Sequence, residues 1–249
     1  MVHVFEYPTI DNLKQAIDDY GLDVVVRNLQ TKELIDVAAR WRIGQSPYRT
    51  GMARRLGILE GLMIIAGRFS LDAVKTVAPG ADPTLFGPMA QYGPRLRHQW
   101  PRCVSTLRRD PASRRAVMVL PRWTETATPD CPCTVAVQFL IRRGVLTMHA
   151  YYRSWDITWG VPYDVMSLGL VGVVTAHILN VVPGTLTAYV ASLHCYESTE
   201  DRAAGNTMLS VGAHLGNNPR DVRRTADLLV SMPGKIYEYC TLEEAIAYD

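Results

Sequence analysis

The sequence predicts a single α+β domain over residues 1–249, and three observations lead to this fold class. A chain of 249 residues with 48% hydrophobic residues is long and apolar enough to fill one large core. Nearly all-apolar stretches of helix length occur beside runs rich in β-branched and aromatic residues. Proline and glycine punctuate short segments, and we find no internal repeat, low-complexity tract or flexible linker that would divide the chain.

The first apolar stretch covers residues 50–67 and is predicted to be a buried helix that ends at Gly67. It carries one acid, Glu60, near its centre. A buried carboxylate is costly unless it is paired or its pKa rises so that it stays neutral. Glu60 is therefore either a functional acid or a partly exposed, salt-bridged one. The proline- and glycine-rich region after the helix, residues 70–97, is predicted to be irregular.

Further along the chain, the sequence predicts a strand, a hairpin and a second buried helix. The strand covers residues 116–120, and the hairpin joins residues 134–141 to residues 145–154 through an Arg-Arg-Gly turn. Residues 164–179 are nearly all apolar and predict a central helix. On this pattern alone, Asp164 would be an ordinary N-terminal cap of that helix.

Composition limits the partners that we expect. Lys and Arg total 26 against 24 Asp and Glu, so the formal net charge is only +2, and a protein that binds a nucleic-acid polymer normally carries a larger excess. We find neither the roughly 18 to 20 uninterrupted apolar residues of a membrane span nor the layout of a secretion signal. The 5 cysteines are spread over the chain, which fits a reducing compartment. We expect a cytoplasmic protein that contacts neither a membrane nor a nucleic-acid polymer.

Two segments carry residue types suited to anion binding and nucleophilic catalysis. Arg114 and Arg115 are consecutive residues just before the predicted strand at residues 116–120. There they would either clamp a phosphate or form a solvated basic turn. Cys133 stands at the entry of a predicted strand. A nearby cation would make it a nucleophile, although a buried structural cysteine is the common alternative.

Polar residues also gather at the end of the hairpin and around residue 194. Arg153 and Ser154 point to opposite faces of an extended chain, and Arg153 and Asp156 are either site residues or a simple ion pair. His194 and Tyr196 alternate on a short segment and are either site residues or satisfied polar groups of the core.

A metal site is not expected. The residues that would form one are Cys131, Cys133, His194 and Cys195. Their spacing does not match the usual zinc motifs, so a zinc-binding module is the remotest alternative.

Taken in order, these residues resemble the motifs of thymidylate synthase and its relatives, the pyrimidine nucleotide hydroxymethylases. The resemblance is strong over residues 130–197, extends upstream through a double-arginine loop and an acid-bearing helix, and is looser near the N-terminus. The motifs are residues 27–34 with Arg27, the helix with Glu60, Asp110-Pro111-Ala112-Ser113-Arg114-Arg115, Pro132-Cys133 with Gln138-Phe139, Arg153-Ser154-Trp155-Asp156, Gly160-Val161-Pro162-Tyr163-Asp164 and His194-Cys195-Tyr196. The ordered set is far more specific than any single member.

The resemblance implies a thymidylate synthase fold, in which a mixed β-sheet is packed with helices and one sheet face forms a homodimer interface. It also implies a role for each matched residue. Cys133 would attack C6 of a pyrimidine, and Glu60 would organise water and relay protons. The ligand-binding residues would be Arg27, Arg153 and Ser154 for the phosphate, with Arg114 and Arg115 from across the dimer interface, His194 and Tyr196 for the sugar, Asp164 and Gln138 for the base, and Asp156 and Gly160 for a folate.

Asp164 departs from the synthases that act on uracil, which have Asn at this position. Cytosine presents an amino donor at C4 and an acceptor at N3, which a carboxyl group can match with one acceptor and one proton. Uracil would leave buried polar groups unpaired, so the resemblance implies that Asp164 selects cytosine. Ser154 is the residue found in relatives that use deoxynucleotides, which favours dCMP, with CMP as a possible substrate.

The implied activity is the transfer of a one-carbon unit from 5,10-methylenetetrahydrofolate to C5 of a cytosine nucleotide, without a metal. A Cys133–C6 adduct and water addition to an exocyclic methylene would give the 5-hydroxymethyl nucleotide. Altered folate contacts suit this last step, since Met63 and Ile64 replace a Trp-Phe pair, Thr134 replaces a common His, and residues 73–86 lack tryptophan. The alternatives are a C5 methyltransferase on dCMP or dUMP and a catalytically idle nucleotide-binding dimer.

Overall fold

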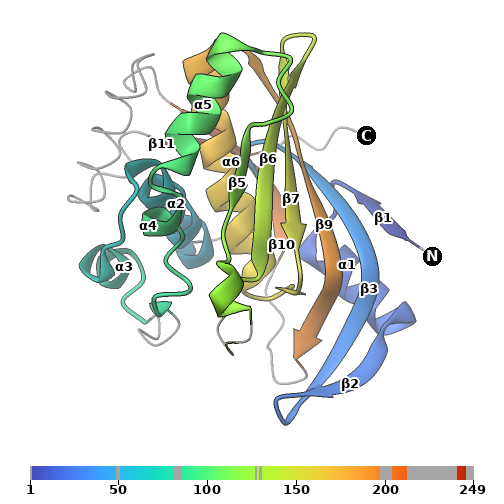
Figure 1. The fold of residues 1–249 in the computed structure, drawn as a ribbon. Helices are drawn as coiled ribbons and strands as arrows, with labels where there is room; N and C mark the ends of the chain where they lie inside the picture. The colour runs from blue at the N-terminus through green and yellow to red at the C-terminus, as the bar shows by residue number, and fades with distance from the viewer. Residues whose placement is uncertain are drawn as a thin grey trace.

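The computed structural model describes residues 2–48, 51–80, 86–126, 128, 131–196, 204–211 and 240–244. The strands are β1 (His3–Glu6), β2 (Leu22–Val26), β3 (Leu29–Arg42), β4 (Gln45–Tyr48), β5 (Val117–Val119), β6 (Thr134–Arg142), β7 (Val145–Tyr152), β8 (Trp155–Asp156), β9 (Val182–Tyr196), β10 (Ala204–Val211) and β11 (Cys240–Glu244). Eight of them form one sheet of order β1-β3-β9-β7-β6-β5, to which β2 is added beside β3 and β8 beside β9 (Figure 1). The other three form a small sheet of order β11-β10-β4.

The large sheet is mixed. The pairs β1–β3, β7–β9 and β8–β9 are parallel, whereas β2–β3, β3–β9, β5–β6 and β6–β7 are antiparallel. Because β8 adds in parallel to the end of β9, the residues that follow β7 are held beside the C-terminal end of β9.

Helices cover one face of this sheet. They are α1 (Ile10–Tyr20), α2 (Gly51–Ala66), α3 (Leu71–Val77), α4 (Tyr92–Leu96), α5 (Gln99–Arg109) and α6 (Gly160–Leu179). Figure 1 shows α2 to α6 on the same side of the strands, where α6 packs on β7 and β9, α5 packs on β5 and β6, and α2 packs on α6. α1 packs against β3 and β9.

The contact between α2 and α6 depends on glycines of α2. A Cβ atom on Gly57 would lie 2.7 Å from Cβ of Met166, and one on Gly61 would lie 2.8 Å from the carbonyl oxygen of Ser167. α6 is long and apolar enough to span a membrane by length and composition, but 78% of its apolar window is buried inside the protein. It is therefore a core helix, as the apolar run of residues 164–179 predicts.

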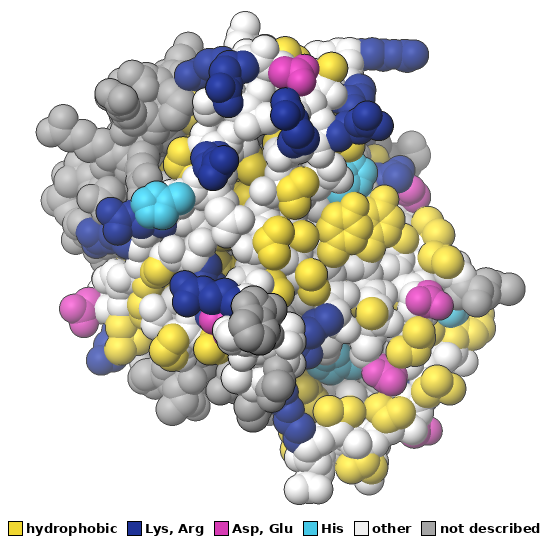
Figure 2. Space-filling view, viewed as in Figure 1, with side chains coloured by type: hydrophobic (Ala, Val, Ile, Leu, Met, Phe, Trp, Pro, Cys, Tyr) yellow, Lys and Arg dark blue, Asp and Glu magenta, His cyan; other side chains and the backbone are white. Residues whose placement is uncertain are grey.

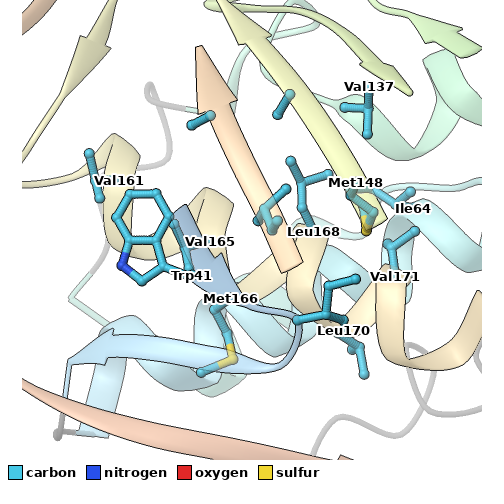
Figure 3. Packing of buried hydrophobic residues seen from close by; sticks show 14 of the residues in the cluster. Trp41, Ile64, Val137, Met148, Val161, Val165, Met166, Leu168, Leu170 and Val171 are labelled. Atoms are coloured by element: carbon cyan, nitrogen blue, oxygen red, sulfur yellow. The ribbon is translucent and has the colours of Figure 1, made fainter. Parts of the chain in front are cut away.

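The core lies between the sheet and these helices. Figure 3 shows Trp41 of β3, Met148 of β7 and Ile64 of α2 along the side of α6 that carries Leu168 and Val171. Each of the five side chains is at most 3% exposed. Burial of the whole core is the main source of hydrophobic free energy, and contacts such as these fix α2, α6 and the strands relative to one another.

The other face of the sheet displays apolar and aromatic side chains. Successive side chains of a strand alternate between faces, and Tyr151 of β7 and Tyr189 of β9 are 39% and 40% exposed on the outward side. Their rings stack with centroids 5.3 Å apart, and Val117 and Val119 extend the apolar surface along β5. Figure 2 shows hydrophobic side chains gathered over these strands. A contiguous apolar surface of this kind is typical of an interaction face.

Three predicted elements are confirmed. α2 occupies residues 51–66 and is followed by Gly67 at φ 72°, the left-handed conformation that ends many helices. The hairpin is formed by β6 and β7, whose turn residues Arg143 and Gly144 have φ values of 52° and 73°. Positive φ at both positions is the mark of a type I′ turn, which matches the twist of the flanking strands. The strand expected at residues 116–120 is β5.

Three expectations are wrong. Residues 70–97 are not wholly irregular, because they contain α3 and α4, which are too short to show a helical period. The central helix begins at Gly160 rather than at Asp164, since Pro162 is tolerated in a first turn where its missing N–H has no helical partner. Asp164 is therefore not the cap. His194 lies not on a short segment but near the end of the 15-residue strand β9.

Candidate active site

Cys133 lies immediately before β6, where Arg153 holds the chain around it. Nη2 of Arg153 donates to the carbonyl oxygen of Cys131 at 2.6 Å and lies 3.7 Å from Sγ of Cys133. Nε of Arg153 donates to the carbonyl oxygen of Pro132 at 3.2 Å, and its main-chain N–H donates to that of Cys133 at 3.0 Å. One arginine thus fixes three successive residues and places a positive charge beside the thiol.

The pKa of Cys133 is raised overall, because the effect of burial exceeds that of the neighbouring arginines. Arg153 and, more weakly, Arg27 lower this pKa, while Asp164 raises it further. Arg27 lies on the turn between β2 and β3, and its charge reaches both Cys133 and Tyr196. The expected influence of Arg153 is present, but it does not outweigh burial, so the thiol form is favoured.

Asp164 lies inside the first turns of α6, with its carboxyl group buried. Oδ2 accepts a hydrogen bond of 2.9 Å from Nε1 of Trp155, and the Tyr152 hydroxyl also donates to the carboxyl group. Burial raises the pKa of Asp164 to about 7, against the opposing effect of these two hydrogen bonds. A carboxyl group with this pKa can both hold and release a proton near neutral pH.

Glu60 lies in the middle of α2 and lines a cavity of about 20 Å³. Burial raises its pKa to about 8, and the charge of Asp164 adds to the rise. Phe69, Phe86 and Tyr92 line the same cavity, with the two phenylalanine rings stacked at 6.2 Å. A polar cavity of this size accommodates a single water molecule. Glu60 is therefore an acid that holds its proton beside a space suited to water.

Tyr92 joins the site, although no pattern in the sequence indicated it, and its partner is Thr134, which the sequence marks only as the replacement of a common His. The Tyr92 hydroxyl donates to Oγ1 of Thr134 at 3.2 Å, and its electrostatic interactions reach Cys133 and Asp164. Burial raises the Tyr92 pKa far above its usual value, so the hydroxyl is a neutral donor. The neighbouring Gly93 is the sequence feature that could have indicated close packing at Tyr92, because a Cβ atom at position 93 would collide with the main chain at the end of α2.

His194 and Tyr196 stand at the end of β9, beside the segment that follows β7. Nδ1 of His194 lies 3.4 Å from Oγ of Ser154, and the His194 and Tyr196 rings meet edge to face at 5.1 Å. The register of β8 on β9 pairs Asp156 with His194. Burial lowers the pKa of His194 although Asp156 acts to raise it, so the imidazole is neutral at pH 7. A neutral imidazole and a phenol offer both donors and acceptors to hydroxyl groups.

An aromatic surface lies between Asp156 and α6. Oδ1 of Asp156 accepts from the main-chain N–H of Thr158 at 2.9 Å, which fixes the carboxylate. Trp159, beside Gly160, is 37% exposed and stacks on Tyr163 with centroids 6.3 Å apart. A fixed carboxylate near an exposed and a half-buried aromatic ring is suited to a flat heterocycle that carries N–H donors.

Three predicted residues lie apart from this group within the chain. Arg114 and Arg115 are exposed between α5 and β5, and Arg115 lines a groove of about 680 Å³. Gln138 lies between the buried residues Val137 and Phe139 of β6, so its side chain is on the opposite sheet face, where Nε2 donates to the carbonyl oxygen of Arg114 at 2.9 Å. The expected contact of Gln138 with the base is therefore not supported by its position in this chain.

The described part of the chain contains no group of three or more His, Cys, Asp or Glu side chains placed to hold a metal ion. Cys103, Cys131, Cys133 and Cys195 are free thiols. The zinc arrangement considered above is thus not assembled by these residues.

The matched motifs and the geometry agree with comparisons to known proteins. The sequence model of the thymidylate synthase family matches residues 89–214, about half of the chain. The chain belongs to the thymidylate synthase family. The match includes the Cys133, Arg153, Asp164 and His194 motifs, whereas Arg27 and Glu60 lie before it.

Relatives and solved structures are consistent with this assignment. The thymidylate synthase 1/2 of Encephalitozoon cuniculi is 34% identical over 98 residues, which are 37% of this chain and 32% of that protein. The thymidylate synthase of Saimiriine herpesvirus 2 is 32% identical over 96 residues, again 32% of its length. The chain thus spans about a third of the curated relatives that it matches.

The crystal structure of thymidylate synthase from T4 phage superposes with a TM-score of 0.70 and 18% identity, covering 96% of both chains. This likeness shows the fold. The expected thymidylate synthase fold, a mixed sheet packed with helices, is confirmed. The expected hydroxymethylase branch is a finer assignment than these matches make, since the relatives carry the name thymidylate synthase.

Proposed function

We propose that this protein transfers a one-carbon unit from 5,10-methylenetetrahydrofolate to C5 of a cytosine nucleotide, dCMP in preference to CMP, and forms the 5-hydroxymethyl nucleotide. The observation that carries the proposal is Asp164, a buried carboxyl group with a pKa of about 7 whose charge acts on the Cys133 thiol. Synthases that act on uracil have an amide at this position. The proposal extends to a cytoplasmic, single-domain protein over residues 1–249.

Base selection follows from the donors and acceptors of Asp164. In its neutral form, one oxygen accepts from the 4-amino group of cytosine while the other donates its proton to N3. Uracil reverses both positions, with a donor at N3 and an acceptor at C4. A buried site that matches the donors and acceptors of cytosine leaves polar groups unpaired when uracil binds. Unpaired buried polar groups are costly, so the site discriminates strongly between the two bases.

The same proton supports attack on the ring. Cys133 loses its proton to solvent beside the exposed Arg153, and its Sγ forms a bond to C6. The electron pair of the C5–C6 double bond moves toward N3, which receives the proton of Asp164, so that the ring stays neutral and C5 becomes nucleophilic. Asp164 takes the proton back whenever the C4–N3 double bond re-forms, and so acts as a shuttle.

Phosphate and sugar would be held by the residues around Cys133. Arg153 and Arg27 both carry charge to this region, and the Ser154 hydroxyl lies beside them. His194 and Tyr196 offer partners to the sugar hydroxyl. These groups come from the ends of β7 and β9 and from the β2–β3 turn. Their convergence from segments far apart in the sequence supports the binding of one common ligand.

The folate would lie against Asp156, Gly160, the exposed Trp159 and the half-buried Tyr163 that stacks on it. A fixed carboxylate next to stacked aromatic rings fits a pterin, which presents N–H donors on a flat ring. Bound methylenetetrahydrofolate supplies a one-carbon unit at the oxidation level of formaldehyde. The chain's own part is to orient that group with Asp156 and to hold protons at Glu60 and Asp164.

The last step in the proposal is water addition to the exocyclic methylene on C5, which forms once C5 has lost its proton and the C–N bond to the released tetrahydrofolate has broken. Glu60 lines the water-sized cavity and, once ionised, can take a proton from water as the new C–O bond forms. Cys133 then leaves C6 as the C5–C6 double bond re-forms. The pKa of about 8 keeps Glu60 mostly protonated at pH 7, so this step gains from higher pH.

The proposal includes a homodimer with shared sites. The apolar outward face around Tyr151 and Tyr189 offers a surface for a second copy, and Arg114 and Arg115 are exposed near its edge at β5. Arginines that find no site within their own chain are suited to the phosphate of a neighbouring subunit. Gln138, which holds the Arg114 carbonyl oxygen, would then support that loop.

Methylation of C5 is the second candidate, favoured by the relatives that bear the name thymidylate synthase. The two reactions differ in what quenches the exocyclic methylene, which is water in one and hydride from the folate in the other. Their products therefore differ by an oxygen atom, and only methylation yields dihydrofolate.

The test is product analysis by mass spectrometry. The purified protein is incubated with methylenetetrahydrofolate and dCMP, CMP or dUMP, with samples lacking folate as controls. We expect dCMP to gain CH₂O without formation of dihydrofolate. A gain of CH₂ with dihydrofolate would establish the methyltransferase instead, and no turnover of any nucleotide would leave only a binding protein.

A further inference from the structure

Trp155, the variable residue of the Arg-Ser-x-Asp motif, is held in one position from several sides. Its side chain is 2% exposed and stacks on Tyr152 with ring centroids 4.1 Å apart. Trp41 meets it edge to face at 5.9 Å. At the start of α6, a Cβ on Gly160 would lie 2.9 Å from Cδ1 of the indole, so the glycine leaves room for the ring. The indole therefore cannot turn without displacing core residues.

The single polar atom of this ring points at the carboxyl group that we assign to base recognition. Nε1 of Trp155 lies 2.9 Å from Oδ2 of Asp164. An indole N–H donates and never accepts. Oδ2 is thus kept as an acceptor, and when the carboxyl group is neutral its proton is directed to Oδ1, because a hydroxyl oxygen is the weaker acceptor.

We propose that Trp155 is a positioning residue for base selectivity, which fixes Oδ2 of Asp164 toward the exocyclic group at C4 and the proton-bearing Oδ1 toward N3. This inference rests on the proposed function. With this assignment, Oδ2 accepts from the amino group of cytosine and Oδ1 delivers its proton to N3. Uracil requires the reverse arrangement, with a proton on the oxygen that already faces the Trp155 N–H, and two donors would then oppose each other.

The surroundings of Asp164 make this proton placement sensitive to one hydrogen bond. Among the described residues, the titratable groups that interact with it are Glu60 from α2, Tyr92 from α4, Cys133 before β6 and Tyr152 from β7. Burial raises the pKa of Asp164, whereas the hydrogen bonds donated by Trp155 and Tyr152 lower it. Loss of the indole N–H therefore raises the Asp164 pKa and releases Oδ2 from its fixed donor, while the hydrogen bond from Tyr152 remains.

The first test is Trp155→Phe, which keeps an aromatic ring and removes the donor. We expect the ratio of kcat/KM for dCMP over dUMP to fall by about tenfold, the value of one buried hydrogen bond. The limb of the pH profile that reports Asp164 should also move to higher pH. Benzothienylalanine at position 155 replaces the N–H by sulfur in a ring of the same shape, and it serves if the phenylalanine variant does not fold.

The matched control is Trp41→Phe. This tryptophan is equally buried and touches the same ring, but its N–H donates to the carbonyl oxygen of Pro8 at 2.9 Å. The substitution should lower stability and leave both the base ratio and the pH profile unchanged. An effect of packing alone would appear equally in both variants.

The second test asks how an amide behaves at position 164. In Asp164→Asn the Trp155 N–H would hold the amide oxygen at the Oδ2 position, so the NH₂ group faces N3, where uracil also carries a donor. We expect this variant to lose dCMP turnover without gaining dUMP turnover, and the double variant with Trp155→Phe to gain dUMP turnover by about tenfold or more. A full switch to dUMP in Asp164→Asn alone would overturn the inference.

The outcomes separate the inference from the proposed function. If the native protein converts no cytosine nucleotide, the proposed function fails, and the inference fails with it. If the native protein converts dCMP but neither position-155 variant changes the base ratio or the pH profile, only the inference fails, and Trp155 is a packing residue.

Discussion

Cys133 is the residue on which the proposed covalent catalysis depends, and its replacement by serine tests that role directly. A serine hydroxyl is far less ionised than a thiol beside Arg153, so Cys133→Ser should lower kcat by at least roughly 10³-fold. Nucleotide affinity should change little, because the carbonyl oxygens that Arg153 holds remain. Turnover by mass spectrometry and binding by calorimetry measure the two effects.

Cys103→Ser is the control for this substitution. Cys103 is buried in α5, and burial raises the pKa of its thiol to about 12, so it is chemically inert. This variant should keep its turnover. Full activity of Cys133→Ser would remove the covalent adduct from the mechanism.

The two buried acids predict how stability depends on pH. Folding raises the pKa of Glu60 from 4.5 to about 8 and that of Asp164 from 3.8 to about 7. Between these limits the folded protein binds more protons than the unfolded chain, so the free energy of unfolding falls as pH rises from about 5 to about 8. Glu60→Gln removes one titrating group, and its stability should fall less steeply over this range.

Urea midpoints at the two ends of this pH range measure the effect, at one fixed protein concentration. Asp18→Asn, at an exposed position of α1, should show the same decline as the native protein. An identical decline in Glu60→Gln would mean that Glu60 ionises normally in the folded protein.

At the scale of elements, the α2–α6 contact is the packing that holds Glu60 against Asp164. Gly61→Ala would bring a methyl group 2.8 Å from the carbonyl oxygen of Ser167, and main chain cannot give way as a flexible side chain can. We expect a loss of about 1 to 3 kcal/mol in the free energy of unfolding, measured by urea denaturation. Gly80→Ala, where no atom lies within 4 Å of the added Cβ, should have little effect.

Elements with a continuous chemical signal were predictable from the sequence. The helix α2 and the β6–β7 hairpin follow from an apolar run with a terminal glycine and from two β-rich runs joined by turn residues. α3 and α4 were missed because 7 and 5 residues are too few for a helical period to emerge. The start of α6 was misplaced because a proline in a first turn resembles a helix boundary.

The site shows the same division. Cys133, Arg153, Asp164 and His194 could be found because each lies in a short motif of fixed spacing. Tyr92 and Trp155 acquire their roles only through contacts with Thr134 and Asp164, which come from other elements. Local sequence does not indicate such contacts between distant elements. Gln138 is the opposite case, because it belongs to a motif but the strand β6 directs its side chain to the other face of the sheet.

At the scale of the whole molecule, the proposed shared sites predict complementation between two inactive variants. Cys133→Ser and Arg115→Ala should each be inactive as homodimers. After subunit exchange, a hybrid dimer contains one site with native Cys133 and native Arg115, so random mixing should restore about a quarter of native activity. Steady-state turnover of the mixture measures it.

The control for complementation is a mixture of Cys133→Ser with a subunit that carries both substitutions, which offers no complete site. Size-exclusion chromatography of differently tagged subunits would confirm that exchange has occurred. Exchange without any return of activity would contradict the shared arrangement, as would a fully active monomer.

The raised pKa of Cys133 has a consequence for the lifetime of the protein. Oxidation to sulfenic acid and alkylation proceed through the thiolate, and burial keeps Cys133 in the thiol form despite the adjacent Arg153. The proposed nucleophile is thereby shielded from peroxide while no reaction is under way. The desolvation that slows activation of the Cys133 thiol therefore also protects this thiol from oxidation.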